Sequence, residues 1–296
     1  MYEDIKKNKI KTGFIISLFI IVITLVSYYI CNAFDLGSYS ILFAVLISIL
    51  LTWTSYFYSD KIILSLNRAR PATHEQDQKL SNILDALVIS SGLEYKPKLY
   101  VMDDPQLNAF ATGKNPKNSV ICVTTGLLDN LDYYELEGVI AHELAHVKNY
   151  DILLSAIVTV MVGLLVMLSD VFTRTMFYGK RDRDSDSKGN SLLMIIGLVL
   201  LILSPIFANL MKLALSRRRE FLADSTAIQF TRNPDGLISA LKKLDSDSHI
   251  LKTANKATSH MYIVNPVKAT QKRQKTSIMS THPSIDDRIE ALENLK

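Results

Sequence analysis

Four uncharged stretches dominate the pattern of apolar and polar positions in this chain of 296 residues. They cover residues 12–34, 36–59, 152–169 and 189–211. A helix of about 20 residues crosses the roughly 30 Å hydrocarbon core of a bilayer. We therefore predict a multi-span membrane protein with about four transmembrane helices, at about 13–32, 40–58, 152–172 and 191–212. The third helix could enter the bilayer only in part, because its apolar run is short and lies between two aspartates.

The two remaining segments are polar, and together they provide roughly 170 residues, which is enough for one hydrophobic core. Their residue pattern predicts an amphipathic helix at 81–93 and further helices at 132–150, 216–231 and 283–295. Short β-rich runs predict strands at 98–102, 109–112 and 119–124, with a turn at Gly113 and Asn115-Pro116. The predicted fold class is therefore α+β, mainly α.

This order of segments predicts two membrane hairpins that alternate with the two parts of one polar domain. The hairpins occupy residues 1–60 and 151–215, and the parts of the polar domain occupy 61–150 and 216–296. Loops at 180–190 and 268–281 are polar and would be exposed to proteolysis.

The basic residues orient the first hairpin. Four lysines precede the first apolar run and four Lys or Arg residues fall within 61–79, whereas the connection 32–39 has none. By the positive-inside rule, both ends of this hairpin face the cytoplasm. The net charge is only +4, and the basic residues lie beside apolar runs, so a membrane surface explains them better than a nucleic acid does. Two cysteines, Cys31 and Cys122, do not make a disulfide framework.

The candidate chemistry begins at His142-Glu143-Leu144-Ala145-His146. Residues four apart lie on one face of a helix, so both imidazoles can bind the same zinc ion. Glu143 can then reach a water in an open coordination position, which is the minimal machinery for hydrolysing a peptide bond. The alternative is a surface helix with two chance histidines.

A catalytic zinc site needs a third protein ligand. The helix with both histidines leads into the third apolar run, and the fourth returns the chain to the same side at about Ser216. Glu220 and Asp224 follow there, four residues apart on one predicted helix. One carboxylate could bind the zinc while the other accepts the free ring N–H of a ligand histidine. Alternatively, both acids balance the neighbouring arginines.

With these motifs in place, the whole chain resembles the M48 family of membrane zinc metalloproteases, in particular its bacterial heat-shock branch. It is more distantly similar to the CAAX-prenyl proteases. The resemblance implies a zincin-like domain on the cytoplasmic side that holds one Zn²⁺ per chain through His142, His146 and Glu220. It also implies that Glu143 is the general base.

The resemblance extends to residues outside the zinc motif. It implies that Asp224 orients a ligand histidine, and Asp151 matches a further acid of the family. His282-Pro283 followed by Arg288 resembles the family's C-terminal motif, in which the histidine and the arginine stabilise the oxyanion of the tetrahedral intermediate.

The stretch Asn108, Ala109, Phe110 and Ala111, continued by Thr112-Gly113, resembles the family's edge strand. Such a strand can bind an extended substrate by strand addition and present the scissile bond to the metal. From the residues alone, an ordinary short strand would be the simpler interpretation.

The resemblance therefore implies a zinc metalloendopeptidase of the bacterial plasma (inner) membrane. Its active site would face the cytoplasm, its partners would be the lipid bilayer and unfolded or membrane-protein substrates, and its role would be quality control under stress. No nucleic-acid partner is expected, and a homo-oligomer remains open.

Three alternatives have discriminating features. An intramembrane protease would bury its motif in a transmembrane helix, whereas residues 132–150 are rich in charged and amide side chains. A non-catalytic metal-binding membrane protein would not need Glu143. A CAAX-type processing protease of the large chambered kind would need more than four spans.

Overall fold

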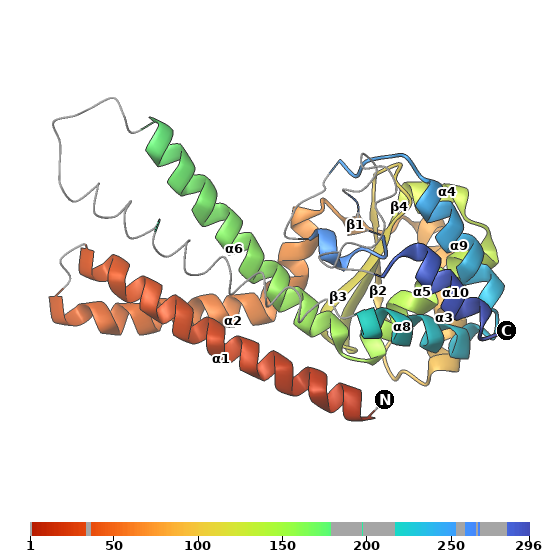
Figure 1. Cartoon of the computed structure of the whole chain (residues 1–296), viewed down its shortest axis with the longest axis horizontal. Helices are drawn as coiled ribbons and strands as arrows, with labels where there is room; N and C mark the ends of the chain where they lie inside the picture. The colour runs from red at the N-terminus through yellow and green to blue at the C-terminus, as the bar shows by residue number, and fades with distance from the viewer. Residues whose placement is uncertain are drawn as a thin grey trace.

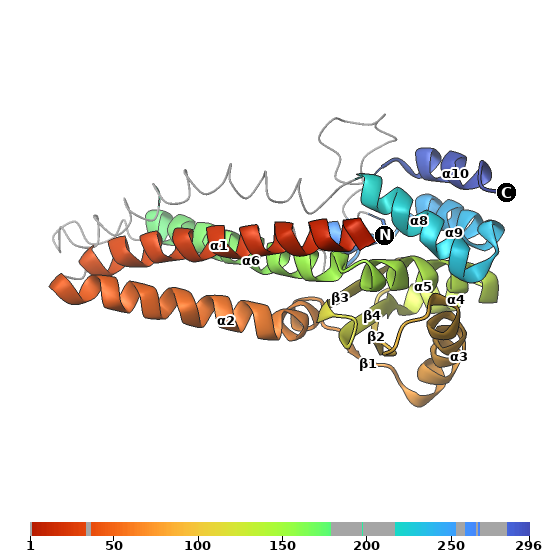
Figure 2. The ribbon, with the colours of Figure 1, turned by 90° about the horizontal axis from the view of Figure 1, so that it is seen from below.

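The computed structural model describes residues 2–33, 37–178, 217–252, 258–264 and 283–296, together with Gly197 and Pro266. Three long helices extend to one side of a domain that contains the β-sheet (Figures 1 and 2). They are α1 (Tyr2–Ala33), α2 (Ser40–Leu66) and α6 (Asp151–Tyr178), and the short 3-10 helix η1 (Gly37–Tyr39) precedes α2. The fold is α+β and mainly helical, as the hydrophobic pattern predicts.

Apolar packing holds the three long helices together. Ile15 and Phe19 of α1 are buried in one cluster with Leu154 and Met161 of α6. A hydrogen bond of 2.8 Å from Thr24 to Ser48 connects α1 to α2. The outer face of α2 exposes large apolar side chains, which suits contact with lipid; they include Leu42, Leu46, Ile49, Leu50 and Trp53.

The four predicted membrane spans are not confirmed. Within the described residues, α2 is the one helix that is long and apolar enough to cross a membrane by itself. Helix α5 (Tyr133–Lys148) and the first part of α6, Asp151–Gly163, would qualify only as a joined pair, and they are bent by 85° at the break between them. The predicted span at 191–212 lies outside the described residues apart from Gly197, as do the loops at 180–190 and 268–281.

The sheet has four strands in the order β1-β2-β4-β3. Strands β1 (Arg70–Pro71) and β2 (Lys98–Met102) are antiparallel, β2 and β4 (Asn118–Thr124) are parallel, and β3 (Ala109–Asn115) forms an antiparallel hairpin with β4. Strand β3 is therefore an edge of the sheet. The register pairs Ala111 with Ile121.

Strand β3 is longer than predicted, because Gly113 lies within it and not in the turn. The register shifts between Gly113 and Asn115, and Gly113 has φ of +137°. A Cβ atom there would lie 2.2 Å from the carbonyl oxygen of Asn118, so only glycine fits this irregularity. The turn follows at Pro116 and Lys117.

Helix α5 is the central element of the domain. Its N-terminus has a capping box in which Asp132 and Glu135 bond each other's backbone N–H groups. The helix packs against β3, β4 and four helices (Figure 1), which are α3 (His74–Ser91), α8 (Arg217–Thr231), α9 (Pro234–Ser246) and the start of α6. Because α5 is enclosed by these elements, we treat it as a core helix of the polar domain and not as part of a membrane span.

Helix α3 differs from the sequence-based expectation in its start, and helices α4 (Thr125–Asn130) and α9 were not expected. Helix α3 begins at His74, seven residues before the predicted start, because Thr73 and Gln76 form a capping box. Helix α9 was not predicted, although Asn233 as N-cap and Pro234 at the first position are typical start signals. The remaining helices are the 3-10 helix η3 (Ser259–Met261) and α10 (Ile285–Glu293).

Candidate active site

The two histidines of the motif lie one turn apart on α5 and point their Nε2 atoms at the same place. These atoms are 3.2 Å apart. The rings lie edge to face with their centroids 4.8 Å apart. His142 is fully buried, and His146 is partly accessible from the pocket described below.

Glu220 approaches this pair from the first turn of α8, which packs beside α5 (Figure 1). Its carboxylate oxygens lie 3.7 Å from the Nε2 atom of His142 and 3.7 Å from that of His146. One ligand atom from each of the three residues falls within 4.8 Å of the others. The structure therefore brings together His142, His146 and Glu220 as a group that could hold a metal ion.

A carboxylate lies behind each histidine. Asp224, one helical turn after Glu220, places Oδ1 at 2.8 Å from Nδ1 of His142. Asp151, the first residue of α6, places Oδ2 at 3.1 Å from Nδ1 of His146. Each carboxylate favours the tautomer with the proton on Nδ1, which leaves the Nε2 lone pair directed at the site.

The pKa values of the two histidines move in opposite directions. Burial and the positive charge of Arg288 lower the pKa of His142, and the contact with Asp224 opposes this only in part. Burial also lowers the pKa of His146, but Asp151, Glu220 and Glu143 outweigh it and raise that pKa to about 9. Without a metal ion, His146 is therefore the member of the pair that holds a proton near neutral pH.

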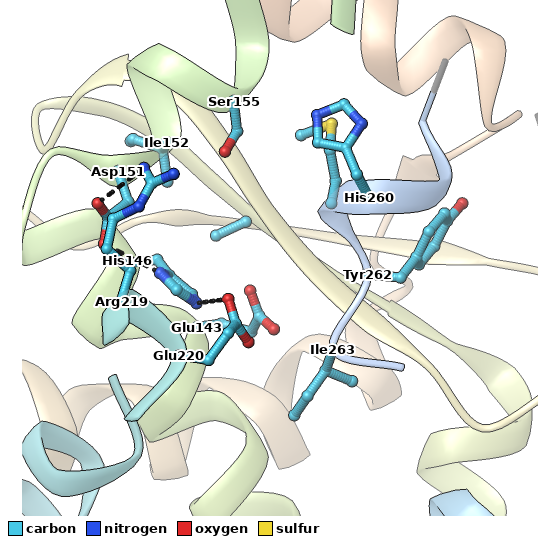
Figure 3. Close-up of a pocket in the computed structure, with 12 residues that line it drawn as sticks. Glu143, His146, Asp151, Ile152, Ser155, Arg219, Glu220, His260, Tyr262 and Ile263 are labelled. Carbon is cyan, nitrogen blue, oxygen red and sulfur yellow. Dashed lines mark hydrogen bonds and ion pairs between the residues drawn. The ribbon is translucent and has the colours of Figure 1, made fainter. Parts of the chain in front are cut away.

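Glu143 lies next to Glu220 and His146 in the pocket (Figure 3) and is only 2% exposed. Burial raises its pKa to about 7, against the opposing effects of the His146 charge and a hydrogen bond from the backbone N–H of Ala111. A carboxylate with a pKa near the working pH is suited to general acid–base catalysis.

Arg288 does not reach into the open part of the site. Its guanidinium is 1% exposed and forms two hydrogen bonds to Asp224, of 2.8 Å from Nε and 2.6 Å from Nη2. Its Nη1 atom donates to the backbone oxygen of Ile263 and lies 4.0 Å from Glu220. Its Nη2 atom also lies 3.3 Å from Nδ1 of His142. The structure therefore places Arg288 behind the ligands, in contact with both Asp224 and His142. His282, the other predicted oxyanion residue, lies outside the described residues.

Part of the predicted substrate strand is already paired within the chain. The N–H of Ile263 donates to the carbonyl oxygen of Ala109 at 3.0 Å. The side-chain amide of Asn108 donates to the backbone oxygen of Val264 at 2.9 Å. Residues 262–264 thus lie along the edge of β3 at Asn108 and Ala109.

The other two predicted substrate residues have different environments. Phe110 is fully buried on the far face of the sheet and packs edge to face against Tyr262, with ring centroids 5.3 Å apart. Ala111 lines the pocket that contains Glu143. Of the four residues, Ala111 is the one that the structure places beside the candidate metal ligands.

The pocket wall opposite the ligands was not predicted from the sequence. It consists of Ser155 from α6 and of His260, Tyr262 and Ile263, as Figure 3 shows. His260 contacts Thr159, which is 101 residues away in the chain. A contact over this separation leaves no local pattern, so no sequence signal would have revealed it. Arg219, which also lines the pocket, directly precedes Glu220 and could have been noticed there.

Two histidines, a glutamate from a second helix and a buried glutamate beside them form the arrangement of a metallopeptidase. Comparison with known proteins agrees. The sequence model of "Peptidase family M48" matches residues 74–296, and the chain belongs to this family.

Similar proteins align with almost the whole chain. It is 47% identical to the protease HtpX homolog of Dictyoglomus thermophilum over 98% of this chain and 93% of that protein. The corresponding proteins of Caldanaerobacter subterraneus and Streptococcus uberis are 42% and 36% identical, over 100% of this chain and over 98% and 100% of their own lengths. The chain is a membrane metalloprotease, and neither a binding-only role nor CAAX processing is favoured.

Among solved structures, the crystal structure of S. mikatae Ste24p matches 99% of this chain and 66% of its own chain. The identity is 19% and the TM-score is 0.46, so the similarity is weak.

Proposed function

We propose that this protein is a zinc-dependent endopeptidase that cleaves damaged or misassembled membrane proteins at the cytoplasmic face of the bacterial plasma membrane. The observation that carries the proposal is the convergence of His142, His146 and Glu220 within 4.8 Å, with Glu143 beside them. Two histidines and one glutamate are a ligand set of catalytic zinc in peptidases, and three protein ligands leave a position for water.

The residues fit one Zn²⁺ per chain for a second reason. Both Nδ1 atoms are engaged by carboxylates, so both Nε2 atoms are available as ligands. When bound there, the metal would supply Lewis-acid chemistry, polarising the substrate carbonyl and making a bound water more acidic.

The remaining steps belong to residues of the chain. Glu143 accepts the proton of the attacking water and then delivers it to the leaving amine. An extended substrate would pair with β3 at Ala111, which lines the pocket, because Ile263 occupies the edge at Ala109. Asp224 and Asp151 orient the two histidines, and Arg288 acts on the site through Asp224. His282 remains our candidate for stabilising the oxyanion.

The proposed location rests on charge and on the site's position. The excess of Lys and Arg flanking the first hairpin favours cytoplasmic ends for that hairpin. The first residue of α6 contacts a ligand histidine, so the active site lies where this long helix leaves the polar domain. This favours substrates that are themselves in the membrane, and self-association into a homo-oligomer remains open.

Chelation followed by metal readdition tests the identity of the metal. Detergent-purified protein, depleted with a chelator, should lose cleavage of fluorescent casein and regain it with one equivalent of Zn²⁺. A His142→Ala variant should not regain it. A metal content below about 0.1 equivalents per chain is roughly one order of magnitude less than a single filled site. Cleavage that survives depletion to that level would refute the proposal.

A further inference from the structure

Within the part of the chain that the structure describes, each carboxylate oxygen of Asp151 contacts a different side chain. Oδ2 lies 3.1 Å from Nδ1 of the ligand His146, and Oδ1 lies 3.3 Å from Nη1 of Arg219. All three side chains are largely buried, with 5% exposure for Asp151 and 11% for Arg219. Figure 3 shows Arg219 and Asp151 in contact beside His146.

The same order of groups occurs behind the other histidine. There, Asp224 contacts His142 with one oxygen and Arg288 with both. The two ligand histidines thus each have an aspartate behind the ring and an arginine bound to that aspartate. On the His142 side, Nη2 of the arginine also lies 3.3 Å from Nδ1 of the ring. The two aspartates and the two arginines come from three helices, α6, α8 and α10, and both histidines come from the ligand helix α5.

We propose that Arg219 is a positioning residue for the metal ligand His146 and acts through Asp151. A buried carboxylate that orients an imidazole needs a partner that fixes its position and neutralises its charge. Without that partner the carboxylate could move away, and the imidazole ring could then rotate. A guanidinium can fix the carboxylate because its N–H donors lie in one rigid plane, and it can neutralise the carboxylate because its charge is permanent. Arg219 thereby keeps Asp151 against Nδ1 and the Nε2 lone pair of His146 on the metal.

The position of Arg219 in the chain gives this contact a second consequence. Asp151 is the first residue of α6, and Arg219 is the third residue of α8. The pair therefore joins the two ends of the segment 152–218, which includes the predicted second membrane hairpin. Arg219 also directly precedes Glu220, so one ion pair fixes the ligand on α8 relative to the ligand on α5. The ion pair that holds the start of α6 against the start of α8 therefore also holds the metal ligands His146 and Glu220 in place.

The test measures metal affinity and not only activity. Full-length protein in detergent is titrated with Zn²⁺ against a chromogenic chelator, and the Co²⁺ form is examined by its visible spectrum. We expect Arg219→Gln to weaken Zn²⁺ about 10- to 100-fold, the range typical for the loss of a partner that orients a ligand, and to shift the Co²⁺ bands. Arg219→Lys should lose less Zn²⁺ affinity, because lysine keeps the positive charge but lacks the planar N–H donors of the guanidinium.

Two further variants make the test specific. Arg218→Gln is the matched control, since Arg218 is the exposed neighbour on the same helix, and it should bind within about twofold of wild type. The double variant Asp151→Asn/Arg219→Gln should bind no more weakly than Asp151→Asn alone, because the arginine acts through the aspartate.

The inference fails if Arg219→Gln binds Zn²⁺ within twofold of wild type. It also fails if the affinity loss of the double variant equals the product of the losses of Asp151→Asn and Arg219→Gln. If Arg219→Gln does not fold, Arg219→Lys decides: a several-fold loss supports the inference, and wild-type affinity with an unchanged Co²⁺ spectrum overturns it. The inference rests on the proposed metal centre. Wild-type protein that binds no metal would refute that centre, whereas metal binding that is indifferent to Arg219 would refute only the role of Arg219.

Discussion

Asp224 connects His142 to Arg288. Its Oδ1 atom lies 2.8 Å from Nδ1 of the histidine and 2.6 Å from Nη2 of the arginine, while Oδ2 accepts the Nε bond. The burial of Arg288 follows from this contact, because a buried guanidinium needs a bidentate carboxylate. The C-terminal helix α10 is thereby tied to the ligand helix through Asp224 and through a direct contact, since Nη2 of Arg288 lies 3.3 Å from Nδ1 of His142.

The first prediction separates two roles for Arg288. If it positions His142, through Asp224 and through its own contact with the ring, then Arg288→Gln should lower the affinity for Zn²⁺ about 10- to 100-fold. If it stabilised the oxyanion directly, the same change would lower kcat and leave metal affinity unchanged. Titration against a chelator, with the exposed Arg218→Gln as control, distinguishes them. An unchanged affinity with a lowered kcat would contradict our placement of Arg288.

The second prediction concerns protons at the metal site. The pKa of His146 is raised to about 9 without metal, chiefly because Asp151 and the neighbouring carboxylates outweigh burial. At pH 7 a metal ion must therefore displace this proton. The affinity for Zn²⁺ should rise about tenfold per pH unit up to about pH 9 and then level off. Competition titrations between pH 6 and 10 would measure this, and an affinity independent of pH would exclude it.

The third prediction concerns stability. Glu135 is buried, which alone would raise its pKa. Hydrogen bonds from Lys243, Ser239 and the Asp132 backbone, two of them of 2.6 Å, lower the pKa overall. The contribution of Glu135 is therefore fully present above its unfolded pKa of about 4.3 and is lost as the pH falls through the lower folded pKa. Glu135→Gln should cost about 1–3 kcal/mol at pH 7.

Thermal unfolding in detergent at pH 7 and at pH 3 would test the role of Glu135. The difference between wild type and Glu135→Gln should shrink as the pH falls toward the folded pKa of this carboxyl, which lies below its ordinary value. Lys243→Met should show the same convergence, because it removes the partner charge. A difference that stays constant with pH would mean that the variant acts through packing.

The local parts of the site could be predicted from the sequence, because helical periodicity alone sets them. The spacing of His142 and His146 and the spacing of Glu220 and Asp224 each fix a shared helix face. The apolar runs likewise predicted helices at α1, α2 and α6. Strand β2 lies where its β-rich run predicted it.

The rest depends on contacts between distant residues, which leave no local pattern. The pairing of Ile263 with Ala109 spans more than 150 residues, and it covers half of the expected substrate strand. The contact of Arg288 with Asp224 is of the same kind, and it moves the arginine from the open site to a place behind a ligand. In both cases the sequence motif identifies Ala109 and Arg288 as candidates, but it does not reveal which residues they contact.

The central claim is that Glu143 is the base of a metal-dependent hydrolysis, and Glu143→Gln tests it most directly. Casein cleavage and metal content should be measured together on detergent-purified wild type and variant, each with and without added Zn²⁺. We predict that the variant binds as much Zn²⁺ as wild type while its rate falls by about 10²–10⁴, the range typical for general acid–base catalysis. Wild-type turnover by a metal-loaded Glu143→Gln protein would contradict the account.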